Sequence, residues 1–509
     1  MANEFKTSKQ APQVEVQALI NLLNNGLIFE TEKTAKSLIE KYPNTFILHN
    51  ILGIALDHQA KFSEAALSYQ HAITMQPNIP DLHFNLGIAL ANTGNLDAAA
   101  QSYRKAISLN PNFFEAYGNL GTVLQKQGSL EDAIKNYRKA LSINKDPRGH
   151  FNLGTALRDG GKLDEAISHF KQAIAMFPNY ADAHNYLGEC YRDQGNMEDA
   201  VKSYQDCLAI HSDHAGANYD MGEFLYLAGR FEEAAEFLEK SQLDDWQERA
   251  LYCHYKAGNF DTFKSRMDNI VRTHKKHDAP FLQTLSTHYA VNFGTENQYN
   301  FCKNGFDFVY QNSIPALAEP NSQLLADLLR DIDNTTIETR AQAMIINGKQ
   351  SAGNLFKRPE TSFRKLGELV RQEFINYKNK FAEADCELIK SFPKQLEFTS
   401  SWYVRLKRGG FLDSHIHEIG WISGAVYLAL PKNKQNPNEG CFEYGLHGDN
   451  YPLQHDNFPV GIASPKVGDI VLFPSSLFHR TIPFNSDEER ICIAFDLKPD
   501  GDIFRKSNY

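Results

Sequence analysis

The chain has 509 residues, enough for two or more hydrophobic cores, and its 52 basic and 62 acidic residues give a formal charge of −10. This acidic balance argues against nucleic-acid binding, and no run approaches the roughly 18 apolar residues of a membrane span. The seven cysteines are scattered without a C-x-x-C pair, and the N-terminus lacks the apolar stretch of a secretory signal. We therefore expect a cytoplasmic protein.

Residues 1–12 are expected to be disordered, and residues 13–275 read as a repeat array. Glycines recur every 33 or 34 residues, and an alanine follows each glycine by 12 residues; the glycines are Gly53, Gly87, Gly121, Gly154, Gly188 and Gly222. This period resembles the tetratricopeptide repeat, in which each unit is a pair of antiparallel helices. The small residues allow the two helices to approach closely. The pattern predicts an α-solenoid of about seven or eight units.

Three asparagines, Asn85, Asn119 and Asn152, occupy the same repeat position. An amide side chain can donate to and accept from the backbone of an extended guest, so we expect these residues to bind a protein or peptide substrate in the concave groove. They resemble the groove asparagines in the repeats of O-linked N-acetylglucosamine transferases. The alternative is that they are solvated polar residues on an exposed helix face.

Residues 276–300 mix helical and extended patterns and are expected to bridge the array to a second domain at 301–509. Two segments in that domain, SQLLADLLRDI and SFRKLGELVRQEFINYKNKFAEA, have apolar residues three and four apart, which indicates amphipathic helices. Apolar runs at 402–406, 422–430, 470–473 and 490–497 are bounded by Gly, Pro, Asn and Asp, which is typical of strands. We expect them to form a barrel core over about 398–499.

Three histidines lie at particular places in this strand pattern. His415 and His417 are two residues apart, so their side chains leave the same face of an extended segment, and His479 follows a later strand after a short turn. Such a set suits a metal held inside a small barrel. Arg490, at the start of the last strand, could bind a carboxylate through two parallel hydrogen bonds.

At these residues the sequence resembles the prolyl-hydroxylase-like branch of the Fe(II)/2-oxoglutarate-dependent oxygenases. The matching motifs run in family order: His415-Ile416-His417, Tyr427-Leu428, Gly440 to Glu443, Pro465 to Phe473, His479, Pro483 and Arg490. The resemblance implies a double-stranded β-helix, or jelly roll, packed with helices, so the whole chain is expected to be an α + β multidomain protein. It also implies Fe(II), 2-oxoglutarate and O2 as cofactors, the three histidines as metal ligands and Arg490 as the partner of 2-oxoglutarate.

One departure from the family pattern is the metal-ligand motif, which is H-x-H here and H-x-D in the family. Three neutral imidazoles leave the same open positions but one more unit of positive charge at the metal, and such a set also fits zinc. A pairing of Asp413 with His415 is a minor alternative. On the first strand, Tyr403 is a candidate for co-substrate contact and Arg405 for substrate contact, although packing and outward exposure explain them equally well.

These features lead to one principal hypothesis about function. The chain would be a 2-oxoglutarate-dependent dioxygenase that hydroxylates or otherwise oxidises a side chain of a polypeptide recruited by the repeats. The alternatives are a non-catalytic peptide-binding scaffold with a degenerate barrel, and a three-histidine metalloenzyme that uses another metal without 2-oxoglutarate.

Overall fold

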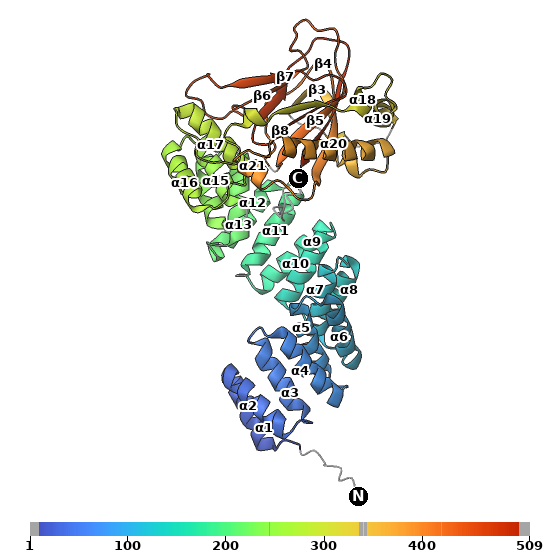
Figure 1. Cartoon of the computed structure of the whole chain (residues 1–509). Helices are drawn as coiled ribbons and strands as arrows, with labels where there is room; N and C mark the ends of the chain where they lie inside the picture. Colours follow the sequence, from blue (N-terminus) through green and yellow to red (C-terminus); the bar gives the residue numbers. More distant parts are fainter. Residues whose placement is uncertain (1–9, 244, 335–338, 341–343, 419, 498–509) are drawn as a thin grey trace. The chain divides into compact units, whose positions relative to one another are not determined.

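The computed structural model describes residues 10–243, 245–334, 339–340, 344–418 and 420–497. The chain divides into two compact units, Met1–Asp220 and Met221–Tyr509 (Figure 1). Most of the segment expected to be disordered, and the ends predicted for the barrel at 499 and for its domain at 509, lie outside the described residues.

The first unit is built of successive helices that pack as pairs, as the repeat period predicts. Its helices are α1 (Gln13–Asn24), α2 (Ile28–Lys41), α3 (Phe46–Asp57), α4 (Phe62–Met75), α5 (Pro80–Asn92), α6 (Leu96–Leu109), α7 (Phe114–Lys126), α8 (Leu130–Ile143), α9 (Pro147–Asp159), α10 (Leu163–Met176), α11 (Ala181–Asp193) and α12 (Met197–Ile210). Helix α13 (Ala215–Leu227) contains the division between the units.

The repeat glycines are sites of close helix approach. A Cβ atom added to Gly87 on α5 would lie 2.5 Å from the ring of Tyr103 on α6. Four of the other repeat glycines likewise face the ring of a Tyr or Phe 16 positions later, Gly222 faces Leu238, and the repeat alanines are fully buried. The predicted function of these small residues in packing is confirmed.

Histidines in the repeats hold the connections between units. His49, His83 and His184 each place Nε2 2.8–3.0 Å from the carbonyl oxygen of the proline six residues earlier. This contact secures the turn that leads into the helix. These histidines therefore have structural partners in their own loops.

The second unit continues with helices and then forms two sheets. Its helices are α14 (Phe231–Ser241), α15 (Trp246–Lys256), α16 (Phe260–Thr273), α17 (Pro280–Phe293), α18 (Pro315–Ala318), α19 (Gln323–Asn334), α20 (Thr361–Lys380) and α21 (Glu387–Lys390), with short 3-10 turns η1 (Gly305–Phe308) and η2 (Leu355–Lys357). The two predicted amphipathic helices are confirmed as α19 and α20. The segment 276–300 contains α17, a regular helix where only a mixed bridge was expected.

The strands are β1 (Tyr310–Ser313), β2 (Thr339–Arg340), β3 (Ile345–Ser351), β4 (Phe398–Leu412), β5 (Ile422–Ala429), β6 (Phe442–Gly445), β7 (Val460–Ala463), β8 (Asp469–Pro474), β9 (Phe478–Thr481) and β10 (Arg490–Leu497). Within the described residues they form an antiparallel sheet of order β1-β8-β5-β10-β4-β3-β2 and a smaller one of order β7-β6-β9. The four predicted strands are confirmed in β4, β5, β8 and β10.

The core of this domain lies between the two sheets. Val404, Tyr427 and Phe473 from the larger sheet pack against Phe442 from the smaller one. The opposite face of the larger sheet is covered by α20, where Phe374 contacts Phe495 of β10 with 6.0 Å between ring centroids (Figure 1). Alternate residues on β10 therefore face either α20 or the interior between the sheets. This alternation decides which side chains of β10 point into the interior between the sheets.

No helix in the described part of the chain combines the length and apolar character needed to cross a membrane.

Candidate metal centre

Three histidines meet where the two sheets are joined. His415 lies just beyond β4 and forms an isolated antiparallel bridge with His479 of β9, with backbone N···O distances of 3.1 and 2.9 Å. The ligand atoms of His415, His417 and His479 lie within 4.8 Å of one another, and the Nε2 atoms of His415 and His417 are 3.3 Å apart. Two imidazole nitrogens about 2.1 Å from one metal ion, at a right angle, would be about 3 Å apart. The arrangement fits a metal ion.

Each histidine has an acceptor behind its ring. His415 Nδ1 lies 2.7 Å from the Asp413 carbonyl oxygen, and His417 Nδ1 lies 2.5 Å from Asp496 Oδ1. His479 Nδ1 lies 3.2 Å from the Leu477 carbonyl oxygen. An acceptor at Nδ1 keeps the proton there and leaves the Nε2 lone pair directed at a metal. The surroundings thus hold all three rings in the tautomer and orientation that metal binding requires.

The electrostatic environment favours neutral imidazoles. Burial, together with the neighbouring His417, lowers the pKa of His415 to about 4, and burial with the two other rings lowers the pKa of His479 well below its ordinary value. Metal binding requires neutral histidine, so His415 and His479 do not have to lose protons at physiological pH.

The carboxylate alternative is not formed. Asp413 is exposed, and its side chain accepts a hydrogen bond from the Ser414 backbone N–H. Among the described residues, the cluster of possible ligands around His415 contains three histidines and no carboxylate. Such a set suits iron and zinc alike.

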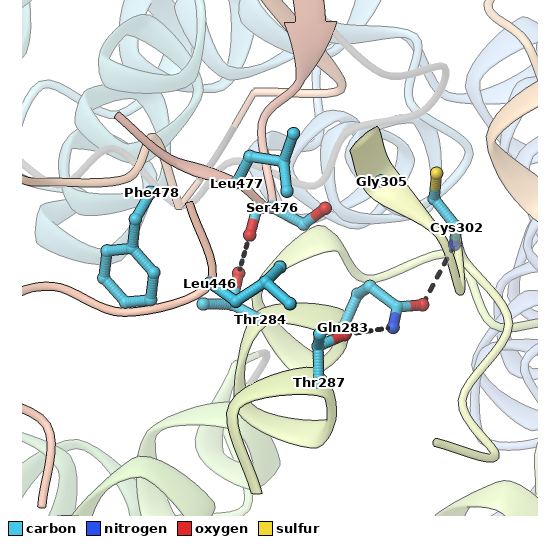
Figure 2. A pocket seen from close by; sticks show the side chains of 9 residues that line it. All are labelled: Gln283, Thr284, Thr287, Cys302, Gly305, Leu446, Ser476, Leu477 and Phe478. Atoms are coloured by element: carbon cyan, nitrogen blue, oxygen red, sulfur yellow. Dashed lines mark hydrogen bonds between the residues drawn. The ribbon is translucent and has the colours of Figure 1, made fainter. Parts of the chain in front are cut away.

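Helix α17 supports the turn that carries the distal histidine. Thr284 on this helix donates to the carbonyl oxygen of Ser476 at 2.8 Å, three residues before His479 (Figure 2). On the same helix, Gln283 donates to Thr287 and accepts from the backbone N–H of Cys302. The Thr284–Ser476 bond ties the β8–β9 connection, and with it the strand of His479, to α17, whereas the Gln283 bonds tie α17 to Cys302.

The same helix also secures part of the polar segment between β5 and β7. Asn292 donates to the Pro452 carbonyl oxygen at 2.9 Å and accepts from the Gln454 N–H at 2.7 Å, while His288 bonds His447 at 2.9 Å. The segment contains β6, and its later part is bonded to α17.

Arg490 is buried between the sheets, on the same face of β10 as Asp496. It is 2% exposed, its Nε donates to the Gly440 carbonyl oxygen at 3.0 Å, and its guanidinium lies 5.1 Å from the ring centre of Tyr427. Among the described residues no carboxylate pairs with it, and the buried hydroxyl of Tyr427 has no hydrogen-bond partner. A buried cation beside an unpartnered hydroxyl fits a carboxylate such as the distal one of 2-oxoglutarate.

The structure does not bring the two β4 candidates to the histidines. Trp402 contacts His417 with 5.6 Å between ring centroids, so Tyr403 and Arg405 lie on the other face of the strand. Arg405 pairs there with Asp333 at 2.5 Å and Glu489 at 3.4 Å. Their assignment to co-substrate and substrate contact stays a prediction that this placement does not favour.

The three groove asparagines lie in the first unit, at equivalent positions on α5, α7 and α9. All three are half-buried, and Asn85 donates to the side chain of Asn50 on α3 at 3.2 Å. Their assignment to substrate binding stays a prediction.

The sequence reasoning missed Asp496, the acceptor for His417. Its signal was present: Asp496 is a carboxylate in an apolar strand, at the same alternation as Arg490. The two residues therefore face the same interior.

Comparison with known families gives independent matches to both parts of the chain. The family model described as "Putative 2OG-Fe(II) oxygenase" matches residues 400–496, and tetratricopeptide-repeat models match segments between residues 68 and 252. Comparison with curated protein sequences gives no match.

Solved structures similar to part of this chain include two that are described as tetratricopeptide-repeat proteins. YrrB, described as a TPR protein with an unusual peptide-binding site, is 24% identical over 36% of this chain and 95% of its own, with a TM-score of 0.32. MamA from Desulfovibrio magneticus is 22% identical over 33% and 95%, with a TM-score of 0.32. A tetratricopeptide repeat protein from Parabacteroides merdae is 18% identical over 47% and 98%, with a TM-score of 0.41.

The chain thus carries tetratricopeptide repeats, and its residues 400–496, which contain the three clustered histidines, match the 2OG-Fe(II) oxygenase family model.

Proposed function

We propose that the protein is an iron- and 2-oxoglutarate-dependent dioxygenase that hydroxylates or otherwise oxidises a side chain of a polypeptide substrate. The proposal rests on two features that both lie in the interior between the two sheets: a cluster of three histidines and a buried arginine beside a buried tyrosine. Three histidines present Nε2 to a common point, and the buried Arg490 and Tyr427 lack a carboxylate partner among the described residues.

Bound iron, 2-oxoglutarate and O2 would supply the oxidising chemistry. His415, His417 and His479 would hold the metal, and Arg490 would bind the distal carboxylate of 2-oxoglutarate, with the Tyr427 hydroxyl as a second donor. The rings of Phe442 and Phe473 lie 5.7 and 4.6 Å from that of His479 and form an apolar wall. Such a wall excludes bulk water from the reacting atoms.

The repeats would recruit the substrate. Asn85, Asn119 and Asn152 recur at one repeat position and are half-buried, which suits hydrogen bonding to an extended backbone. The net charge of −10 favours a polypeptide over a nucleic acid as the partner. All seven cysteines are free and buried, which fits a reducing, cytoplasmic setting.

The test measures 2-oxoglutarate turnover without a known substrate. The purified full-length protein is incubated with Fe(II), O2 and 2-oxoglutarate labelled at C1, and released CO2 is counted. We expect release from the wild type and none from His479→Ala, because that variant lacks a metal ligand. His455→Ala is the matched control, since this ring bonds the Val291 carbonyl oxygen outside the cluster. Wild-type protein with bound iron that releases no CO2 would contradict the proposal.

A further inference from the structure

Asp496 stands behind one of the three histidines. Its Oδ1 atom lies 2.5 Å from His417 Nδ1, and the residue is 8% exposed at the end of β10. The hydroxyl of Ser423 donates to the same oxygen at 2.6 Å, and the hydroxyls of Ser423 and Ser475 are 2.8 Å apart. These bonds fix the carboxylate in one position.

The acceptor of His417 differs from those of the other two rings. His415 and His479 bond neutral backbone carbonyl oxygens, which already suffice to fix the tautomer. His417 alone has a charged acceptor, and His417 is the position at which the H-x-D motif carries its ligand carboxylate. In this chain the carboxylate therefore lies behind the His417 ring, one imidazole farther from the point that the three histidines face.

The charge of Asp496 has no cation to balance it in the described residues. Its only ion-pair partner there is His417, and no lysine or arginine pairs with it. A buried carboxylate without a cation is costly, whereas a divalent ion on the far side of the imidazole would offset that cost. The placement is thus unfavourable unless the cluster carries positive charge.

We propose that Asp496 is a positioning residue that supplies, through His417, the negative charge that a ligand carboxylate would give to the metal directly. This inference rests on the proposed function, because it requires a metal at the three histidines. The carboxylate orients the His417 ring and makes its Nε2 a stronger donor. The H-x-H site then carries the same net charge, including this hydrogen-bonded partner, as an H-x-D site.

The test compares Asp496→Asn with Asp469→Asn. Both residues are buried carboxylates of the larger sheet, and Asp469 bonds Gln311 and the Lys466 N–H, away from the cluster. Apo full-length proteins are titrated anaerobically with Co(II), and binding is followed by the visible absorption of the ion. We expect the Asp496→Asn dissociation constant to rise by roughly 10- to 100-fold, and that of the control to stay at the wild-type value.

A second readout separates charge from structure. In the iron-loaded proteins, loss of the carboxylate should shift the Fe(III)/Fe(II) reduction potential to a more positive value, because the oxidised ion loses a nearby negative charge. Ser423→Ala keeps the carboxylate but removes one bond to it, and should give a smaller weakening of Co(II) binding. Thermal unfolding followed by circular dichroism shows whether each variant is folded.

The outcomes distinguish the two proposals. Wild-type protein that binds metal, with Asp496→Asn equal to it in both affinity and potential, overturns the function of Asp496 and leaves the oxygenase proposal standing. Wild-type protein that binds no metal overturns both. If Asp496→Asn does not fold, Ser423→Ala decides, and wild-type affinity in that folded variant counts against the inference.

Discussion

Replacement of Arg490 by Gln is expected to weaken 2-oxoglutarate binding strongly. Arg490 is 2% exposed; its Nε already donates to the Gly440 carbonyl oxygen, and its Nη1 lies 3.4 Å from Cys492 Sγ. Its remaining donors face an interior without a carboxylate partner among the described residues. Hydrogen bonds to charged groups contribute about 1.5–3 kcal/mol. A loss of about 3 kcal/mol corresponds to a dissociation constant raised about 150-fold.

The assay is calorimetric titration of 2-oxoglutarate into protein loaded anaerobically with Fe(II). The matched control is Arg480→Gln, because Arg480 lies on β9 but is bonded through two N–H groups to the Glu443 carboxylate, at 2.6 and 3.1 Å. The control should bind 2-oxoglutarate like the wild type, and iron affinity should stay unchanged in both variants. Equal 2-oxoglutarate affinity in folded Arg490→Gln and wild-type protein would refute the assignment of Arg490.

Two further predictions concern stability. Gly121→Ala places a Cβ atom 2.7 Å from the Tyr137 ring and should lower the free energy of unfolding, measured by urea titration, by about 1–3 kcal/mol. Gly118→Ala on the same helix meets nothing within 4 Å and should raise this free energy by about 0.5–1 kcal/mol. The reverse order of stability would contradict the packing described. Burial, with His447 and His455 nearby, lowers the pKa of His288 to about 3, below its ordinary value, so its protonation favours unfolding. Its stabilising contribution is therefore complete above about pH 6.5 and falls by about 2 kcal/mol at pH 5, and His288→Gln should reduce the loss of stability between pH 7 and pH 5 by that amount; an unchanged loss would refute this.

The sequence predicts the repeats well because their packing is periodic. Gly87 and Tyr103 meet because each repeat places a glycine and a large apolar or aromatic residue, Tyr, Phe or Leu, at a fixed separation. The residue pattern within one repeat therefore also predicts which side chains touch in the folded array. The strand Arg490–Leu497 was predicted at its observed bounds for a similar reason, since an apolar run between polar turns defines it.

The face on which a strand residue lies was harder to predict. Tyr403 and Arg405 share one alternation, but only the contact of Trp402 with His417 shows that this alternation faces away from the site. A single strand does not reveal which of its faces is interior. Asp496 was missed for the related reason that its partner, His417, is 79 residues away.

Helix α17 escaped prediction because it lacks an apolar face of the usual period. It buries Gln283, Thr284, His288 and Asn292, which bond other parts of the second unit. Polar residues interrupt the pattern that identifies an amphipathic helix. The hydrogen bonds that these polar residues make can be recognised only in the folded structure, because their partners at residue 302 and at residues 447–476 are distant in the sequence.

The most direct test of the account is an anaerobic titration of the apo protein with Fe(II) and then with 2-oxoglutarate, followed by visible absorption. We predict a metal-to-ligand charge-transfer band that appears only after 2-oxoglutarate is added, is lost in His415→Ala, and requires a higher 2-oxoglutarate concentration in Arg490→Gln. Wild-type protein that binds iron but gives no such band would contradict a centre built for 2-oxoglutarate at these three histidines.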